Sequence, residues 1–189
     1  MFGSVQLLVE KGFLMTKIDF KRELKELYNT SARAGSIVVV PALNFLMIDG
    51  HGNPNTAQEY KAAVEALFAV AYALKFKVKR MAPGVDYGVM PLEGLWWVDD
   101  LRYWDDKDKW SWTMMIMQPK YVTAKLARDV MSEVAAKKSL DAVSRLRFEK
   151  LSEGRVAQIL HIGPYSAEKP TIDKLHMFIH EQGYELQGQ

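Results

Sequence analysis

The stretch 154–186 constrains the fold most strongly, because it reads as a strand, a turn and an amphipathic helix in direct succession. An apolar segment leads into a Gly-Pro-Tyr turn at 163–165, and these residue types favour tight turns. The helix that follows carries one apolar stripe at helical spacing, formed by Ile172, Leu175 and Ile179. We therefore expect Tyr165 in the turn and Glu185 at the helix exit to lie beside a sheet. A similar unit at about 36–118 suggests a duplicated fold.

Composition indicates a packed domain, since 49% of the 189 residues are hydrophobic. The net charge is only +2, from 25 basic and 23 acidic side chains, so we expect no nucleic-acid partner. The sequence contains no cysteine, which excludes disulfides and thiolate metal sites and agrees with a reducing compartment. No apolar run reaches the roughly 18 residues needed to span a bilayer. We predict a cytoplasmic protein with no membrane partner, and composition leaves the oligomeric state open.

No compositional break divides the chain, so we predict a single domain over 15–189. Residues 1–14 are interpreted as an upstream extension, with Met15 as the true start. The codons for residues 10–12 would be purine-rich, as a bacterial ribosome-binding site is.

The predicted elements alternate between strands and helices, which indicates an α+β protein. A β-branched run over 37–40 marks a buried strand, and Pro41 predicts an edge, a bend or a restart because proline cannot donate to a ladder. Thr56 and Glu59 have the spacing of a capping box that starts a long helix. The remaining predictions are a short helix over 19–28, strands over 87–98 and 110–117, a helix over 121–138, and a hairpin of 147–151 with 155–162.

The five tryptophans are clustered over 96–112, close to one acidic residue, Glu93. Pro91 and Gly94 flank Glu93, and this pattern predicts a β-bulge that aims its side chain inward. A carboxylate among aromatic residues and methionines suits a flat cationic or electrophilic ligand. If Glu93 is buried, desolvation raises its pKa and makes it a candidate general base, or a counter-charge for a cation. The alternatives are that the tryptophans are core and edge cover, and that Glu93 is solvated.

Other chemistry has less support in the sequence. His176 and His180 are four residues apart on one helix, but no third ligand is evident, so we predict no metal. Glu185 is either a cleft residue or a surface acid at a helix exit. Neither a nucleophile elbow nor a phosphate-binding glycine loop is present, so we expect neither acyl nor phosphoryl transfer, and no cofactor.

Four motifs resemble the stand-alone GyrI-like small-molecule-binding proteins: KIDFKRELKELYN, FLMIDGHGNPN, MPLEGLWW and HIGPYSAEKPTIDKLHMFIHEQGYEL. The resemblance covers the chain from about Met15 and includes the order of the motifs. It implies two pseudo-symmetric strand–helix–strand–strand repeats with antiparallel sheets, over about 36–118 and about 145–189, and a ligand cleft between them. Members usually continue past the Gly-Tyr exit into a final strand whose acidic residue and tyrosine face the ligand. Those two groups cannot be assigned here, which leaves Glu93 and Glu185 to supply negative charge.

The resemblance also implies a function, since relatives include effector-binding domains of multidrug-responsive activators and hydrolases of cyclopropanoid DNA-alkylating compounds. We expect a cleft that binds planar hydrophobic or cationic molecules. Its predicted lining is Tyr60, Glu93, Trp97, Trp112, Met115, His161 and Tyr165. In the hydrolytic hypothesis Glu93 or Glu185 activates water and Tyr165 stabilises the oxyanion. The alternative is a non-catalytic drug-binding or regulatory module.

Overall fold

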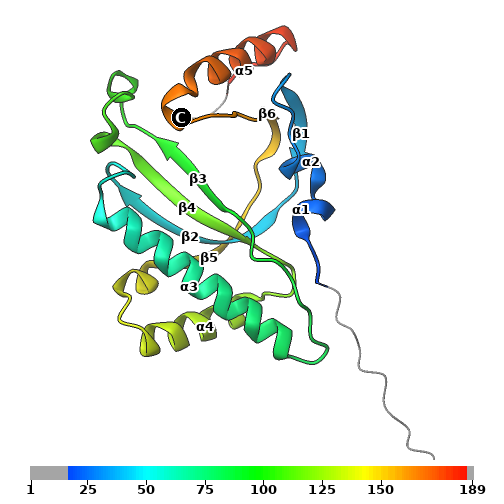
Figure 1. Cartoon of the computed structure of the whole chain (residues 1–189), viewed down its shortest axis with the longest axis vertical. Coiled ribbons are helices and arrows are strands. Elements are labelled where there is room, and N and C mark those ends of the chain that lie inside the picture. Colours follow the sequence, from blue (N-terminus) through cyan, green and yellow to red (C-terminus); the bar gives the residue numbers. More distant parts are fainter. Residues whose placement is uncertain (1–16, 187–189) are drawn as a thin grey trace, which may run out of the picture.

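The structure, a computed structural model, describes residues 17–186, so the predicted extension 1–14 lies outside it. It is an α+β fold with two antiparallel sheets (Figure 1). The strands are β1 (Ser36–Val40), β2 (Leu43–His51), β3 (Leu92–Trp97), β4 (Ser111–Gln118), β5 (Arg147–Leu151) and β6 (Gly154–Gln158). The helices are α1 (Phe20–Glu23), α2 (Lys25–Tyr28), α3 (Gln58–Arg80), α4 (Ala124–Lys137) and α5 (Lys169–Glu181), with short 3-10 turns η1 (Leu101–Tyr103), η2 (Lys107–Lys109), η3 (Asp141–Arg145) and η4 (Tyr165–Ala167).

The main sheet has the strand order β3-β4-β2-β5, and α3 and α4 lie on one of its faces (Figure 1). Alternation along each strand sends two sets of side chains to opposite faces. The set on the helix side includes the fully buried Leu46, Ile48, Trp112 and Ile116. Burial of each aliphatic side chain of this size contributes about 1.5–3 kcal/mol, so this layer anchors the sheet.

The start of α3 differs from the prediction. The helix begins at Gln58 with Ala57 as its N-cap, and no side chain caps it. Asn53 instead organises the preceding turn, because its carbonyl accepts the amide N–H groups of Thr56 and Ala57 at 3.1 and 2.8 Å. Glu59 pairs with Arg145 rather than closing a capping box, so the predicted box was wrong.

The predicted hairpin around 152–154 was also wrong. β5 and β6 follow one another in a single direction, with β5 paired to β2 and β6 paired to β1 (Figure 1). The register is continuous, since Leu43 opposes Leu151 and Val40 opposes Gly154. The ladder is interrupted opposite Pro41, which has no N–H to donate, and this interruption separates the two sheets.

The predicted bulge at Glu93 is absent as well. β3 and β4 keep one regular register, in which Leu92, Glu93 and Gly94 oppose Ile116, Met115 and Met114 in turn. A Cβ at Gly94 would lie 2.8 Å from the indole nitrogen of Trp96, so glycine here makes room for packing. Ordinary strand alternation, and not a bulge, therefore decides on which face of the sheet the Glu93 side chain lies.

The first unit, β2-α3-β3-β4, has the predicted strand–helix–strand–strand order, and β6 with α5 repeats its strand–helix part. In α5 only Ile179 is buried. Phe178 packs on Gly35, where a Cβ would lie 2.6 Å from the ring. α5 thus packs on the small sheet and the segment before it, away from the main core.

Candidate functional site

Glu93 lies on β3 and, by alternation, on the face of the main sheet opposite Trp96, Trp112 and α3. Its cross-strand neighbour is Met115. The hydroxyl of Tyr28 donates a hydrogen bond of 2.7 Å to Glu93 Oε1. Burial raises the pKa of Glu93 above its ordinary 4.5; the Tyr28 hydrogen bond opposes this rise and the charge of Glu153 adds to it. The carboxylate is therefore half-buried, fixed in position and less acidic than a surface glutamate.

The sequence did not single out Tyr28 as a site residue. In its segment, Phe20, Leu24 and Tyr28 pack against the core. These three residues are spaced four apart, and this helical spacing was the sequence signal that they share one face.

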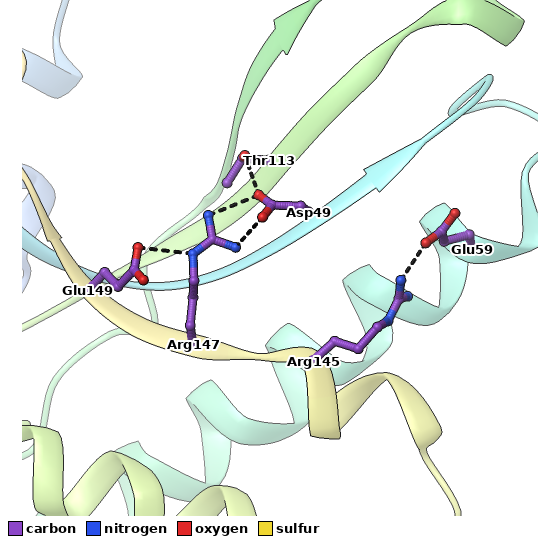
Figure 2. Close-up of polar contacts among 6 residues, drawn as sticks. All are labelled: Asp49, Glu59, Thr113, Arg145, Arg147 and Glu149. Atoms are coloured by element: carbon purple, nitrogen blue, oxygen red, sulfur yellow. Dashed lines mark hydrogen bonds and ion pairs between the residues drawn. The ribbon is translucent and has the colours of Figure 1, made fainter.

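A second polar group lies on the same face as Glu93, by alternation along the paired strands. Figure 2 shows the ion pairs and hydrogen bonds within this group. The guanidinium of Arg147 donates to both carboxylate oxygens of Asp49, at 2.6 and 2.9 Å, and its Nε donates to Glu149 at 2.9 Å. Thr113 donates its hydroxyl to Asp49 at 2.6 Å. Burial opposes ionisation, but these hydrogen bonds hold the pKa of Asp49 below its ordinary value. With two carboxylates around one guanidinium, this group adds net negative charge to the face.

The structure separates the two tryptophans predicted to line the cleft. Trp97 is half-buried and shares the face of Glu93 by alternation along β3. Trp112 is fully buried on the helix side, where its indole N–H donates to the carbonyl of Gly52 at 3.2 Å. The ring of Tyr60 packs edge-on against Trp112, with 5.3 Å between centroids. Trp112 is thus placed in the core, and Met115, its sequence near-neighbour, is placed on the opposite face.

Tyr165 stands on the turn before α5 and is 82% exposed. Burial raises the pKa of Tyr60, and the charge of the Tyr165 phenol raises it further. His161 supports this turn. Its Nε2 contacts the carbonyl of Pro164 at 3.2 Å, and its Nδ1 contacts the hydroxyl of Thr171 at 2.9 Å. Because a carbonyl only accepts, Nε2 carries the proton, and the two ring nitrogens contact the turn and α5.

Glu185 lies in a different place, beside a cavity of about 620 Å³ between the small sheet and α5. Apolar side chains of both elements line it, and its polar groups come from Arg155, His176, Tyr184 and Glu185. Arg155 lies over the ring of Tyr184, 5.6 Å from its centroid. This volume is within the usual range of small-molecule pockets. The structure does not bring Glu185 and Glu93 together in one cavity.

A second cavity of about 360 Å³ lies between α3 and α4, on the far side of the main sheet from Glu93. Within residues 17–186, no three His, Asp or Glu side chains form a group that could hold a metal ion. Over the same residues, no helix has both the length and the apolar character of a membrane span.

Three solved structures similar to this chain come from Listeria innocua. An uncharacterized conserved protein is 37% identical, with a TM-score of 0.82 over 88% of this chain and 82% of that chain. A protein described as a hydrolase is 36% identical, with a TM-score of 0.77 over 88% of this chain and 82% of that chain. A further hydrolase structure is 38% identical, with a TM-score of 0.77 over 89% of this chain and 82% of that chain. No curated protein sequence matches the chain.

The fold is therefore that of a class of small α+β proteins that includes proteins described as hydrolases. The sequence profile of the GyrI-like small molecule binding domain matches residues 35–189. The chain belongs to this GyrI-like family, as its motifs predicted.

Proposed function

We propose that the face of the main sheet around Glu93 binds planar hydrophobic or cationic small molecules, and that Glu93 activates water for hydrolysis of strained cyclopropanoid electrophiles. The observation that carries this proposal is the half-buried, hydrogen-bonded carboxylate of Glu93 beside Met115 and on the face of Trp97. Aromatic and methionine side chains supply stacking and adaptable contacts, and one carboxylate supplies charge.

Negative charge on this face supports a preference for cations. Glu93, Asp49 and Glu149 share the face, and Glu153 lies near enough to influence Glu93. Arg147 neutralises only part of this charge. A cationic aromatic ligand would gain from both the carboxylates and the faces of aromatic rings.

In the proposed reaction, a water oxygen forms a bond to one cyclopropane carbon while a carbon–carbon bond of the ring breaks. The electron pair of that bond moves into the conjugated carbonyl of the substrate. Glu93 accepts the proton of water, and this proton then neutralises the new oxygen anion, so the carboxylate is regenerated. Tyr165, whose exposed hydroxyl is available to a ligand, is the candidate donor to the developing anion. Glu185, in the cavity under α5, is the second candidate base.

The experiment is incubation of the protein with a cyclopropanoid alkylating compound and detection of the ring-opened water adduct by mass spectrometry. Glu93→Gln should abolish turnover and retain affinity, because glutamine fills the same volume but cannot accept the proton. Glu65→Gln is the matched control, since Glu65 is an exposed carboxylate on α3, on the other side of the main sheet. If the wild-type protein forms no adduct above the buffer rate, the hydrolytic part of the proposal is wrong.

The alternative is a non-catalytic module that sequesters compounds or regulates a partner. It is supported by the family description, which specifies small-molecule binding. In that case Glu93 is a counter-charge, and Glu93→Gln should weaken cationic ligands much more than neutral ligands of the same shape. In both proposals the protein acts in the cytoplasm. The absence of cysteine from the sequence supports this location.

A further inference from the structure

The segment 18–31 lies ahead of the region matched by the family profile, residues 35–189, yet it hydrogen-bonds to both sheets, at Glu93 of β3 and Gln158 of β6. At its start Ile18 forms a bridge with Tyr87. At its end the carbonyl of Ser31 accepts the amide of Leu160 at 3.0 Å, and the carbonyl of Glu26 accepts the side chain of Gln158 at 2.7 Å. The segment therefore ties the strand–helix unit of β6 and α5 to the main sheet.

Packing fixes the part of this segment that carries Tyr28. α1 and α2 are one turn each, with Leu24 between them, and neither would be stable alone. Phe20 packs edge-on against Tyr87 with 6.1 Å between centroids, and Leu24 also packs against the core. The phenol of Tyr28 is thus held by tertiary contacts and not by the helix itself.

The hydroxyl of Tyr28 meets Glu93 across 65 residues of sequence at 2.7 Å. It occupies one carboxylate oxygen, Oε1, and among the described residues no side chain or amide bonds the other oxygen. The titratable groups that face Glu93 are Tyr28 from α2 and Glu153 from the connection between β5 and β6. Burial and the nearby carboxylates raise the pKa of Tyr28, so its hydroxyl stays protonated and remains a donor throughout the neutral range.

We infer that Tyr28 is a positioning residue for Glu93, and that segment 18–31 is therefore a functional part of the ligand site. The Tyr28 hydroxyl holds Oε1 and leaves Oε2 directed to water or to a cationic ligand. It also favours the ionised carboxylate, because its hydrogen bond is to the charged form. This inference rests on the proposed role of Glu93 as the acidic group that meets the ligand.

The test is Tyr28→Phe in the full chain, which keeps the packed ring and removes only the hydroxyl. Binding of acridine orange, a planar cation, is measured by tryptophan fluorescence from pH 4 to pH 8. We expect the acid limb of binding to move to higher pH, with affinity near pH 5 falling about fivefold or more and affinity at pH 8 changing less than about twofold, since one pKa unit corresponds to a tenfold change. Tyr103→Phe is the matched control, because Tyr103 is exposed on η1.

A second measurement separates this inference from the proposed function. The pKa of Glu93 is followed directly through the ¹³C resonance of its carboxyl group in wild-type protein and in Tyr28→Phe, without ligand. A higher Glu93 pKa in Tyr28→Phe supports the positioning role even if acridine orange does not bind, in which case only the proposed function fails. An unchanged Glu93 pKa overturns the inference. The inference is also overturned if Tyr28→Phe weakens binding equally in wild-type protein and in Glu93→Gln, because the Tyr28 hydroxyl would then act on a group other than Glu93.

Discussion

Replacing Gly50 with alanine should destabilise the fold strongly, because Trp112 lies directly against this glycine. A Cβ at Gly50 would lie 2.1, 2.4 and 2.6 Å from three carbons of the Trp112 six-membered ring, well inside an ordinary van der Waals contact. The indole is fully buried and is held by its hydrogen bond to the carbonyl of Gly52 and by the edge of Tyr60. These contacts oppose a shift of the ring away from Gly50.

The cost of this clash can be assembled from its parts. Overpacking a core costs about 1–3 kcal/mol. Displacing the indole also loses a hydrogen bond worth about 0.5–1.5 kcal/mol and an aromatic pair worth about 0.5–1.5 kcal/mol. Alanine offsets about 0.5–1 kcal/mol of this loss of stability, because glycine loses more backbone freedom on folding. The expected net loss is about 1–5.5 kcal/mol, against the about 5–15 kcal/mol that stabilises a typical domain.

Equilibrium urea unfolding of Gly50→Ala and wild-type protein measures this loss. Gly88→Ala is the control, because a Cβ there meets only the end of the Lys17 side chain, at 3.8 Å. Its free energy of unfolding should stay within about 0.5 kcal/mol of wild type, as is usual away from special packing. If Gly50→Ala unfolds at the same urea concentration as wild type, Trp112 is not locked in the core, and its assignment to the helix-side layer is wrong.

Two further predictions concern the face of Glu93. Trp97→Leu should weaken binding of a planar cationic dye by about tenfold, because stacking and cation–π contacts contribute about 0.5–2 kcal/mol; equal affinity by fluorescence titration would remove Trp97 from the site. Asp49→Asn should lower the free energy of unfolding at pH 7 by about 0.5–1 kcal/mol, because it breaks the exposed pair with Arg147 and weakens the bond from Thr113. The pKa of Asp49 is lowered in the folded state, so its stabilisation is present above the ordinary 3.8 and is lost as pH falls through the folded value. The gap between Asp49→Asn and wild type should therefore narrow from pH 7 to pH 3 in urea unfolding, and a gap that widens toward acid would contradict the assignment.

The sequence by itself determined the types of the main elements. The family motifs and the β-branched, alternating and helical patterns identified an α+β chain, and alternation correctly put Trp112 and Met115 on opposite faces of β4. Because Trp112 and Met115 lie on opposite faces of the sheet, they do not line one cleft together. The prediction that both line the cleft does not match their placement. Patterns of this kind depend on neighbours in the chain, which is why they can be read without a structure.

Only the tertiary structure decided which residues meet at the site. Local patterns did not indicate that β5 and β6 continue in one direction and pair with β2 and β1, because a Ser-Glu-Gly sequence also fits a hairpin. They did not indicate that α3 covers the Trp112 face, which leaves Glu93 on the other side. The contact of Tyr28 with Glu93 joins residues 65 positions apart and depends on the packing of the whole N-terminal segment. Periodicity gives each side chain a face, but the partner that the face meets is set by the free energy of packing all the elements together.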